Sequence, residues 1–529
     1  MSASTLTGTA ILVRHVLRRD RVRLAVWIGG ITLLVLITAS SIRDLYPTQA
    51  DLDQAAETAE ANAALIALQG PAYGLDTVGG QVVFNFGAFG FAVVALMGVF
   101  LVGRHTRADE EAGRTELVRA SVAGRNAPVT AVLLVGAVAF AVLGALSALT
   151  LVAQDLPATG SVAFGLAIAG FGFLFACVTA LAAQTVESAR STYGVAAVAL
   201  GVSYVVRAIG DAGSGALSWL SPMGWAQAMR PYAGERWWPL LLLLAASAVL
   251  IWATYALLAH RDVGSGLLPP RPGLAAAGAE LSSPLGLAVR LQRWTVVAWV
   301  AGLALTGVSY GTVVTDVGDL VGDNSALEDL IAQGTGDLTE TFLSTALLTI
   351  ALIGGGFAVS STLRLRGEET AGHAEVVLAT ATARARWGAS HLLVALAGSS
   401  LLLAAAGFGL GTTYGIVIGD AGEIPRLTGA ALAYAPAQWV LVAITFALFG
   451  WRSGAALAAW AAFTAFVVLG FLGQLLGLPE WVLDLSPFHH VPALPAESFG
   501  ALPLMLLTAA AVVLVVAGLA GLRRRDVVA

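Results

Sequence analysis

The sequence lacks lysine entirely, and it has a single cysteine. All 28 basic residues are arginines, so the chain cannot supply the lysine with which a Walker P-loop reaches nucleotide phosphates. The same absence excludes a lysine Schiff base and a lysine nucleophile. Cys177 alone permits neither an internal disulfide nor a metal site built from several cysteines. A Walker-type ATPase site in this chain is therefore excluded.

Charge is also scarce, since 12% of the 529 residues are charged and 57% are hydrophobic. Ordinary soluble domains have about 25% charged and about 45–50% apolar residues. A soluble core cannot hide so much apolar surface, so the composition indicates an integral membrane protein. A helix needs roughly 20 mainly apolar residues to cross a bilayer. Twelve stretches meet this condition: 24–42, 82–103, 129–152, 161–183, 192–210, 239–259, 293–314, 341–362, 389–418, 430–449, 454–476 and 502–522.

The distribution of arginine among the loops predicts the orientation of these spans. Arginines are concentrated before the first span, in the loops 104–125 and 364–386, in the central segment 261–293 and in the C-terminal tail. The loops 43–81 and 315–340 are instead rich in Asp and Glu. Short cytoplasmic loops of membrane proteins carry the excess of basic residues. We therefore expect a multi-pass protein of the plasma (inner) membrane with both termini in the cytoplasm.

The two halves of the chain repeat one another. The matching residues occur in the same order and at nearly the same shift: Arg18, Arg21 and Trp27 with Arg290, Arg293 and Trp299; Gln69-Gly70 with Gln333-Gly334; residues 107–118 with 366–377; Ser221-Pro222 with Ser486-Pro487; and 261–263 with 525–527. Because each half has an even number of spans, the repeats are parallel. We expect two six-span halves, 1–263 and 286–529, joined by a cytoplasmic Pro/Gly-rich linker at 264–285.

A charged motif follows the second span of each half. In 107–118 and 366–377, an Arg is followed by acidic residues, a Gly and a further Glu. We expect each segment to form a short charged helix, with its acids near the positive end of the helix dipole. Gly costs about 1 kcal/mol inside a helix, so Gly113 and Gly372 indicate a bend or the close approach of another backbone. Recurrence in register favours a binding surface over a solvated loop that only sets topology.

The Glu-Glu-x-Gly-Arg-x-Glu-Leu-Val pattern at 110–118 resembles the cytoplasmic coupling region of ABC-2-type permeases. Over its full length, including Arg-Asp-Val-Gly-Ser-Gly-Leu-Leu-Pro at 261–269, the chain resembles the fused twelve-span actinobacterial permeases that export polyketide antibiotics such as tetronasin. The resemblance implies the type V exporter fold. This is an all-α integral membrane protein with twelve transmembrane helices, arranged as two parallel-repeat six-helix bundles with cytoplasmic coupling helices.

The resemblance also assigns roles to several segments. It implies amphipathic connecting helices at 9–23 and 284–293, before the first span of each half. It also implies short re-entrant segments on the outer side of the membrane at 219–238 and 481–500, before the last span of each half. The 107–118 and 366–377 segments would dock into two copies of a separate ABC ATPase subunit. That subunit would bind ATP and Mg²⁺, while this chain would be a non-catalytic permease without a cofactor or metal of its own.

The implied coupling residues are Arg107, Glu110, Glu111, Gly113, Arg114, Glu116, Arg366, Glu368, Glu369, Gly372 and Glu375. The second copy departs from the first at Thr370 and His373, where the first copy has Glu111 and Arg114. We therefore expect the two docking surfaces to contact their partners unequally.

The expected cargo is a hydrophobic or amphipathic small molecule, taken from the inner leaflet or cytosol and exported, as in antibiotic and multidrug efflux. Candidate residues of the substrate cavity are Phe84, Asn85, Phe86, Phe89, Tyr204, Phe342, Thr345 and Phe466. For each of them, packing against lipid or a neighbouring helix is the alternative. Membrane lipid is an expected partner, and nucleic acid is not.

Two other functions remain open. A proton-driven secondary transporter can also have six-plus-six parallel repeats, but it needs acids deep in its spans. No Asp or Glu lies near the middle of a predicted span. An ABC exporter of a lipid or cell-envelope component would share the fold. His489-His490 suggests a metal pair, but no acid or thiol lies at ligand spacing, so a packing role fits better.

Overall fold

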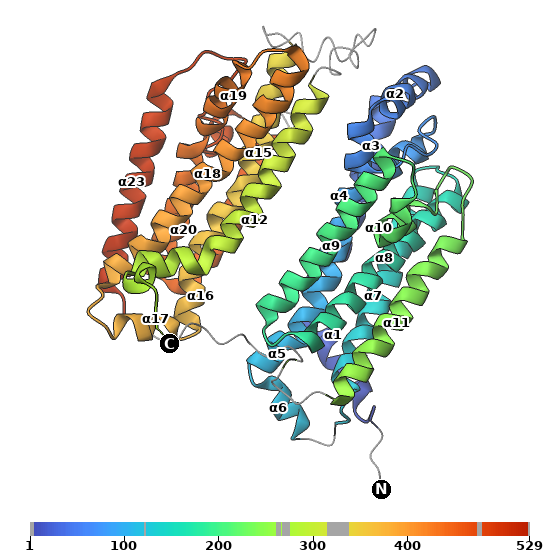
Figure 1. Ribbon diagram of the computed structural model, residues 1–529, viewed down its shortest axis with the longest axis horizontal. Helices are drawn as coiled ribbons and strands as arrows, with labels where there is room; N and C mark the ends of the chain where they lie inside the picture. Colours follow the sequence, from blue (N-terminus) through green and yellow to red (C-terminus); the bar gives the residue numbers. More distant parts are fainter. Residues whose placement is uncertain are drawn as a thin grey trace. The chain divides into compact units, whose positions relative to one another are not determined.

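The computed structural model describes residues 5–120, 123–260, 266, 276–314, 338–472 and 479–526. These residues form helices and connecting turns without a β-strand, and twelve of the helices are long and apolar enough to cross a membrane. The predicted all-α, twelve-helix membrane protein is confirmed. The chain divides into two compact units, 1–272 and 273–529, each described here by itself (Figure 1).

Some predicted features lie outside the described residues. They include the linker 264–285 apart from Gly266 and 276–285, the acidic loop from 315 to 337 with the repeat marker Gln333-Gly334, and the marker 261–263. The predicted boundaries of the two halves therefore stay a prediction.

Unit 1 is a bundle of six spanning helices: α1 (Thr9–Leu45), α4 (Val78–His105), α7 (Ala127–Val152), α8 (Ala158–Thr185), α9 (Ala189–Ala212) and α11 (Trp238–His260). Helix α8 lies at the centre, where it packs against α4, α7, α9 and α11, and its Phe164, Phe171 and Phe175 are fully buried. The backbones of α7 and α8 touch, because a Cβ on Gly144 would lie 2.4 Å from the carbonyl oxygen of Gly165. Small residues permit such close approach of membrane helices.

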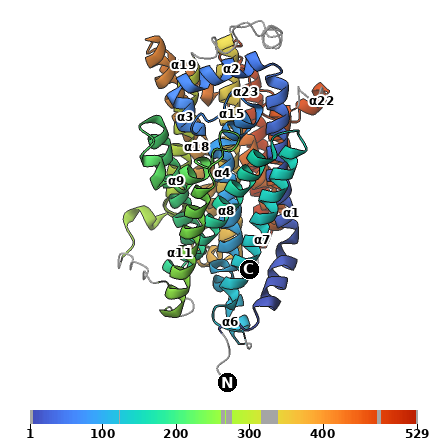
Figure 2. The same cartoon turned by 90° about the vertical axis from the view of Figure 1, so that its right-hand side faces the viewer.

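Short helices lie at both ends of unit 1 (Figures 1 and 2). At one end are α2 (Gln49–Ala61), α3 (Ala63–Gln69), η1 (Leu217–Leu220) and α10 (Pro222–Gln227). At the other end, beside the start of α1, are α5 (Arg107–Glu111) and α6 (Arg114–Arg119). The segment predicted as re-entrant, 219–238, consists of the end of η1, α10 and turns, and it buries Met223, Ala226 and Met229 in the unit.

Unit 2 has six spanning segments of its own, whose main helices are α12 (Pro284–Val313), α15 (Leu338–Thr362), α18 (Arg384–Ile418), α20 (Ala435–Trp451), α21 (Ala459–Leu472) and α23 (Ala501–Arg524). Two of these segments include a short helix before the main one: Glu423–Trp451 ends with α20, and Ser453–Gly470 contains most of α21. Helix α18 packs along α12, and α20 packs along α23. The shorter elements are η2 (Ala279–Ser282), α16 (Arg364–Thr370), α17 (His373–Leu378), α19 (Glu423–Leu432), η3 (Ser453–Ala458) and α22 (Glu480–Leu483). The second segment predicted as re-entrant, 481–500, contains the end of α22 followed mainly by turns.

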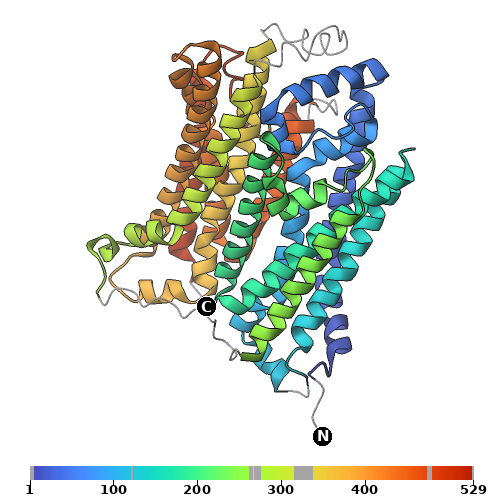
Figure 3. The ribbon, with the colours of Figure 1, turned by 45° about the vertical axis from the view of Figure 1, so that its right-hand side comes forward.

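The structure differs from two predictions: that each span is an uninterrupted helix, and that the connecting helices are separate from the spans. The predicted span 82–103 is broken at Gly87, which has φ +40° and ψ −153° inside α4. Residues 9–23 and 284–293 are helical but continue directly into the spanning parts of α1 and α12. The first turns of α12 run at an angle to the rest of that helix (Figure 3).

Candidate coupling site

Each charged motif folds as two short helices joined at its glycine, so the expectation of one short helix is wrong. Gly113 separates α5 from α6 with φ +69°, and Gly372 separates α16 from α17 with φ +73°. L-residues other than Gly rarely adopt this left-handed conformation. Among the described residues, no atom lies within 4 Å of a Cβ placed on either glycine. Within this chain the repeated glycine therefore makes the bend, and it does not accommodate a neighbouring backbone of the described part.

An ion pair spans the bend in both units. In unit 1, Arg114 Nη1 donates to Asp109 Oδ1 at 2.8 Å. In unit 2, His373 Nδ1 lies 3.3 Å from Glu368 Oε2 at the aligned position. The sequence difference between Arg114 and His373 thus preserves the position of the contact, although His carries its charge only when protonated.

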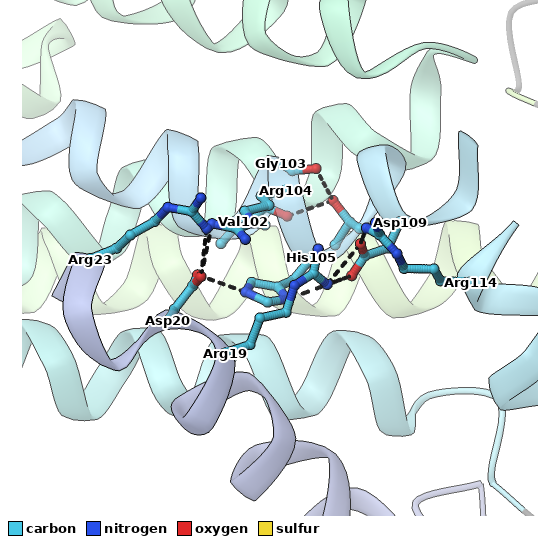
Figure 4. Close-up of polar contacts among 10 residues, drawn as sticks. Arg19, Asp20, Arg23, Val102, Gly103, Arg104, His105, Asp109 and Arg114 are labelled. Atoms are coloured by element: carbon cyan, nitrogen blue, oxygen red, sulfur yellow. Dashed lines mark hydrogen bonds and ion pairs between the residues drawn. The ribbon is translucent and has the colours of Figure 1, made fainter. Parts of the chain in front are cut away.

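The acidic side of the bend in unit 1 is tied to α1 (Figure 4). Arg19 on α1 donates through Nη1 to both carboxylate oxygens of Asp109, at 2.7 and 2.9 Å. His105, at the end of α4, places Nδ1 3.6 Å from Asp109. Hydrogen bonds between ionised partners are roughly twice as strong as those between neutral groups. The Arg19–Asp109 pair therefore links the start of α1 directly to α5.

A second carboxylate lies behind this pair. Asp20 is only 3% exposed, and its Oδ2 lies 2.7 Å from His105 Nε2. Its Oδ1 accepts from Arg23 at 3.1 Å and forms an ion pair with Arg104, whose Nη1 lies 2.9 Å away. His105 thus stands between two carboxylates, one from α1 and one from α5, as Figure 4 shows. We call Arg19, Asp20, Arg23, Arg104, His105 and Asp109 the α1 junction; it joins α1, α4 and α5.

Arg107 anchors α5 to the interior of unit 1. Its side chain is 1% exposed, and its Nε donates to the carbonyl of Ala183 near the end of α8 at 2.8 Å. Its Nη1 also donates to Glu110 at 2.6 Å. Glu111 accepts from the backbone N–H of Ala189, the first residue of α9, at 2.8 Å. A displacement of α5 would therefore act on α1, α4, α8 and α9 together.

The corresponding segment of unit 2 is anchored differently. Arg525, just after α23, forms a bidentate pair with Glu369 at 2.5 and 2.8 Å, and its guanidinium lies 4.9 Å from the ring centroid of Phe449. Glu368 pairs with Arg364 one turn earlier at 2.5 Å. The link to another spanning helix therefore runs to α23. Arg366 is half-buried beside these groups.

The α1 side of the junction has no charged equivalent at the repeat-related positions of α12 in unit 2. The positions 272 residues after Arg19 and Asp20 are Leu291 and Gln292. Gln292 is buried, accepts from Ser361 at 2.6 Å and lies 3.4 Å from His391. A charged link from this part of the first spanning helix to the bent segment is therefore found in unit 1 and not at the aligned positions of unit 2.

Glu116 and Glu375 lie in the first turns of α6 and α17, and both side chains are exposed. They occupy aligned positions just after the glycine bend. Of the implied coupling residues, these two acids are exposed, as are Glu111 and Arg114. Arg107, Glu368 and Glu369 are instead buried in anchoring contacts.

The predicted cavity residues do not share one environment. Phe86 is 2% exposed and packs edge-on against Phe91 and Phe164, with ring centroids 5.8 and 5.2 Å apart. Phe84 is buried in a small cluster beneath α2 and α3. Asn85 and Phe89 are exposed, and Phe89 lies beyond the break at Gly87.

The remaining cavity candidates are also distributed between core and surface. Tyr204 is half-buried and donates to the carbonyl of Leu68 at 3.3 Å. In unit 2, Phe466 belongs to the core, Phe342 is half-buried against Tyr310, and Thr345 is exposed. Their role in a substrate path stays a prediction.

Sequence reasoning missed the importance of Asp20, His105 and Arg525. In the sequence, Arg19 is one of the arginines that indicate the topology, and Arg525 is a marker of the repeat. The signal for Asp20 was its position as a lone acid among five arginines before the first span. Among the described residues, no three His, Cys, Asp or Glu side chains are placed to hold a metal ion. His490 instead contacts the carbonyl of Asp484 at 2.8 Å.

Comparison with known proteins adds a functional context to this geometry. A family model described as "Multidrug efflux system permease Rv1217c, C-terminal domain" matches residues 281–523. The chain is also 45% identical, over 528 residues, to the multidrug efflux system permease protein Rv1217c of Mycobacterium tuberculosis. That similarity covers 99% of this chain and 96% of the relative, and it therefore extends over both units.

Proposed function

The chain belongs to the family of the multidrug efflux system permease Rv1217c, and from this premise we propose that it is the permease subunit of an ATP-driven ABC exporter. Two copies of a separate ATPase subunit would dock on α5–α6 and α16–α17 and would hold the ATP and Mg²⁺. The cargo would be a hydrophobic or amphipathic compound. The permease would lie in the plasma membrane, with both of its termini in the cytoplasm.

The observation that carries the proposal is the repeated pair of short helices bent at Gly113 and Gly372. Each pair exposes an acid just after the bend, Glu116 or Glu375. Another acid of each pair anchors it to the bundle: Asp109 pairs with Arg19 on α1, and Glu369 pairs with Arg525 just after α23. A surface needed only for solubility requires no such anchoring. An accessible face on a firmly anchored element is what a moving partner needs in order to transmit force.

The contacts also suggest how a docking event would reach the membrane. A shift of α5 would pull α1 through Arg19–Asp109 and would move α8 through Arg107. A shift of α16 would act on α23 through Glu369–Arg525. Packed helices respond to such shifts by moving between discrete arrangements rather than by continuous deformation. We infer that ATP binding would switch the bundle in this way.

The alternative of a proton-driven transporter gains little support from the buried acids. Among the described residues, the buried acids are Asp20, Glu368, Glu369 and Glu423. Each lies near the end of a spanning helix or in a short helix beside one, and each is paired with arginine or histidine. Proton relays use titratable groups inside the spans. An ABC exporter of a lipid or cell-envelope component would use the same coupling contacts.

The test reverses the charge of both exposed acids. In Glu116→Arg/Glu375→Arg, we expect loss of ATPase co-purification and of ATP-dependent efflux, with unchanged amounts of permease in the membrane. The control is Glu57→Arg/Glu60→Arg, which makes the same change of net charge on the exposed face of α2 at the opposite end of unit 1. Unaltered co-purification and efflux in the first variant would contradict the docking proposal.

A further inference from the structure

A cavity beside the α1 junction combines positive charge with aromatic walls. Its volume is about 460 Å³, and its lining includes Asp20, Arg23, Trp27, Phe100, Arg104 and Tyr193. Small-molecule sites in proteins commonly have volumes of roughly 300–1,000 Å³ and a few polar groups on mainly apolar walls. The cavity is lined entirely by α1, α4 and α9 of unit 1.

The spacing along two helices builds this cavity. Arg23 and Trp27 are four residues apart on α1, and Phe100 and Arg104 are four residues apart on α4. Residues at this spacing share one face of a helix. The rings of Trp27 and Phe100 are 6.1 Å apart, and Tyr193 from α9 continues the wall at 5.8 Å from Phe100. Each helix thus contributes one guanidinium and one aromatic ring.

The two guanidiniums lie at the boundary of the predicted spans, which begin at 24 on α1 and end at 103 on α4. The aromatic rings lie one turn further into the apolar region. The cavity is therefore amphipathic along the expected membrane normal, with its charge at the predicted cytoplasmic boundary and its apolar wall toward the membrane interior.

The charge of the cavity is not balanced within it. Arg23 and Arg104 both contact the same oxygen of Asp20, and the other oxygen contacts His105. Within the described part of the chain, Asp20 is the acid that forms ion pairs with either arginine. One carboxylate thus faces two permanent cations, and Arg23 is 58% exposed. The surplus positive charge favours an anionic group in the cavity.

We propose that this cavity binds an amphiphile with an acidic head, either a carboxylate, a sulfonate or a phosphate, at Arg23 and Arg104. Its apolar body would lie along Trp27 and Phe100, pointing into the membrane. The positions aligned with the two arginines in the second half are Thr295 and Leu363, so acid binding belongs to the first half. As a statement about cargo, this inference rests on the proposed export function. An inner-leaflet anionic phospholipid offers the same head chemistry.

The test measures binding by the full chain in phosphatidylcholine nanodiscs, without ATPase or ATP. The probes are 11-(dansylamino)undecanoic acid and its methyl ester, which differ in the charge of the head. We expect the acid to bind about tenfold more tightly than the ester, because only the ionised head forms charge-assisted hydrogen bonds with Arg23 and Arg104. Equal binding of the two probes would overturn the proposal.

Variants assign the preference to the cavity. R23Q/R104Q is expected to lose about tenfold in affinity for the acid and to leave the ester unchanged, while R23K/R104K keeps much of the acid binding. The control R18Q/R21Q removes two exposed arginines from the same helix outside the cavity, and it should bind both probes normally. Equal losses in the control would overturn the proposal.

Asp20→Asn provides a test of opposite sign. It removes the carboxylate that competes for both arginines, so it should strengthen binding of the acid and not of the ester. If the arginines had a purely structural role, Asp20→Asn would not increase the affinity for the acid probe. A lower affinity for the acid probe in a folded Asp20→Asn chain would contradict the inference. Folding is monitored by the thermal midpoint of each variant.

The two sources of the acidic head are separated by replacing part of the phosphatidylcholine with phosphatidylglycerol. If the difference between the wild type and R23Q/R104Q disappears, the site is occupied by anionic phospholipid; if it persists, the site prefers a free acidic amphiphile. Because no ATPase is present, failure of probe binding would leave the proposed export function untouched. Failure of ATPase docking would likewise leave the binding result intact.

Discussion

Replacing Arg19 by Gln tests whether movement of α5 reaches the first spanning helix through the Arg19–Asp109 pair. The change removes the cation that contacts both oxygens of Asp109 at 2.7 and 2.9 Å. It leaves Asp109 in contact with Arg114 and His105. The short helices α5 and α6 should therefore stay folded, while their connection to α1 is weakened.

The expected magnitude follows from the burial of the pair. The side chains of Arg19 and Asp109 are 22% and 16% exposed, so the pair lies between a surface ion pair and a buried one. A hydrogen bond to a charged group contributes about 1.5–3 kcal/mol, and exposed pairs contribute about 0–1 kcal/mol. We therefore expect a coupling energy of about 1–2 kcal/mol. If this energy is used in transmission, efflux should fall about five- to thirtyfold, while ATP hydrolysis continues.

The assay is a double-mutant cycle with R19Q, D109N and R19Q/D109N, read as efflux rate per ATP hydrolysed at matched membrane levels. D109N should be the more damaging single change, since it also weakens the contacts with Arg114 and His105. Adding R19Q to D109N should then cost little more. The control is R18Q, which alters the exposed neighbouring residue. Strictly additive effects, or equal efflux by R19Q and R18Q, would refute transmission through this pair.

Three further predictions concern the bend, the unit 2 anchor and helix packing. Gly113→Ala forces an L-residue into φ +69°. The strained backbone should destabilise the bend by about 1–2 kcal/mol, so less ATPase should co-purify with the permease. An unchanged amount of co-purified ATPase would contradict the role of the bend. Arg525→Lys keeps the charge but loses the bidentate pair with Glu369. It should lower the free energy of unfolding, measured in denaturant, by about 2 kcal/mol. An unchanged free energy of unfolding would show that the pair contributes little to stability. Gly144→Leu places atoms where the α7 and α8 backbones touch and should cost about 1–3 kcal/mol. Gly194→Leu, which meets nothing within 4 Å, is its control in the same thermal unfolding measurement, and equal midpoints would contradict the packing account.

The twelve spanning helices were predictable because bilayer thickness fixes the length of an apolar run, whatever the tertiary structure. The bend at Gly113 was partly predictable, since an aligned Gly recurs at 372 inside a helical pattern. The break at Gly87 was not. Helix α4 contains several glycines, and nothing in the sequence distinguishes Gly87 from the others. In the fold, Gly87 faces the end of α3, where the carbonyl oxygen of Gln69 lies 2.8 Å from a Cβ placed on it.

The α1 junction was beyond sequence reasoning for a physical reason. Asp20 and His105 are 85 residues apart, and their 2.7 Å contact exists because α1 packs against α4. In the sequence, Arg19 indicates only the topology, whereas in the fold it forms an ion pair with Asp109. The repeat predicts two coupling regions, and the differences at Thr370 and His373 predict that they are unequal. Only the structure shows that one is tied to α1 and the other, through Arg525, to the end of α23.

Transport by the purified chain tests the central claim most directly. The chain is reconstituted in proteoliposomes with and without the ATPase that co-purifies with it, and uptake of an efflux substrate is measured with ATP or with a proton gradient alone. The proposed function predicts uptake only when both the ATPase and ATP are present, and no effect of the proton gradient. Uptake by the chain alone, driven by the proton gradient, would contradict it.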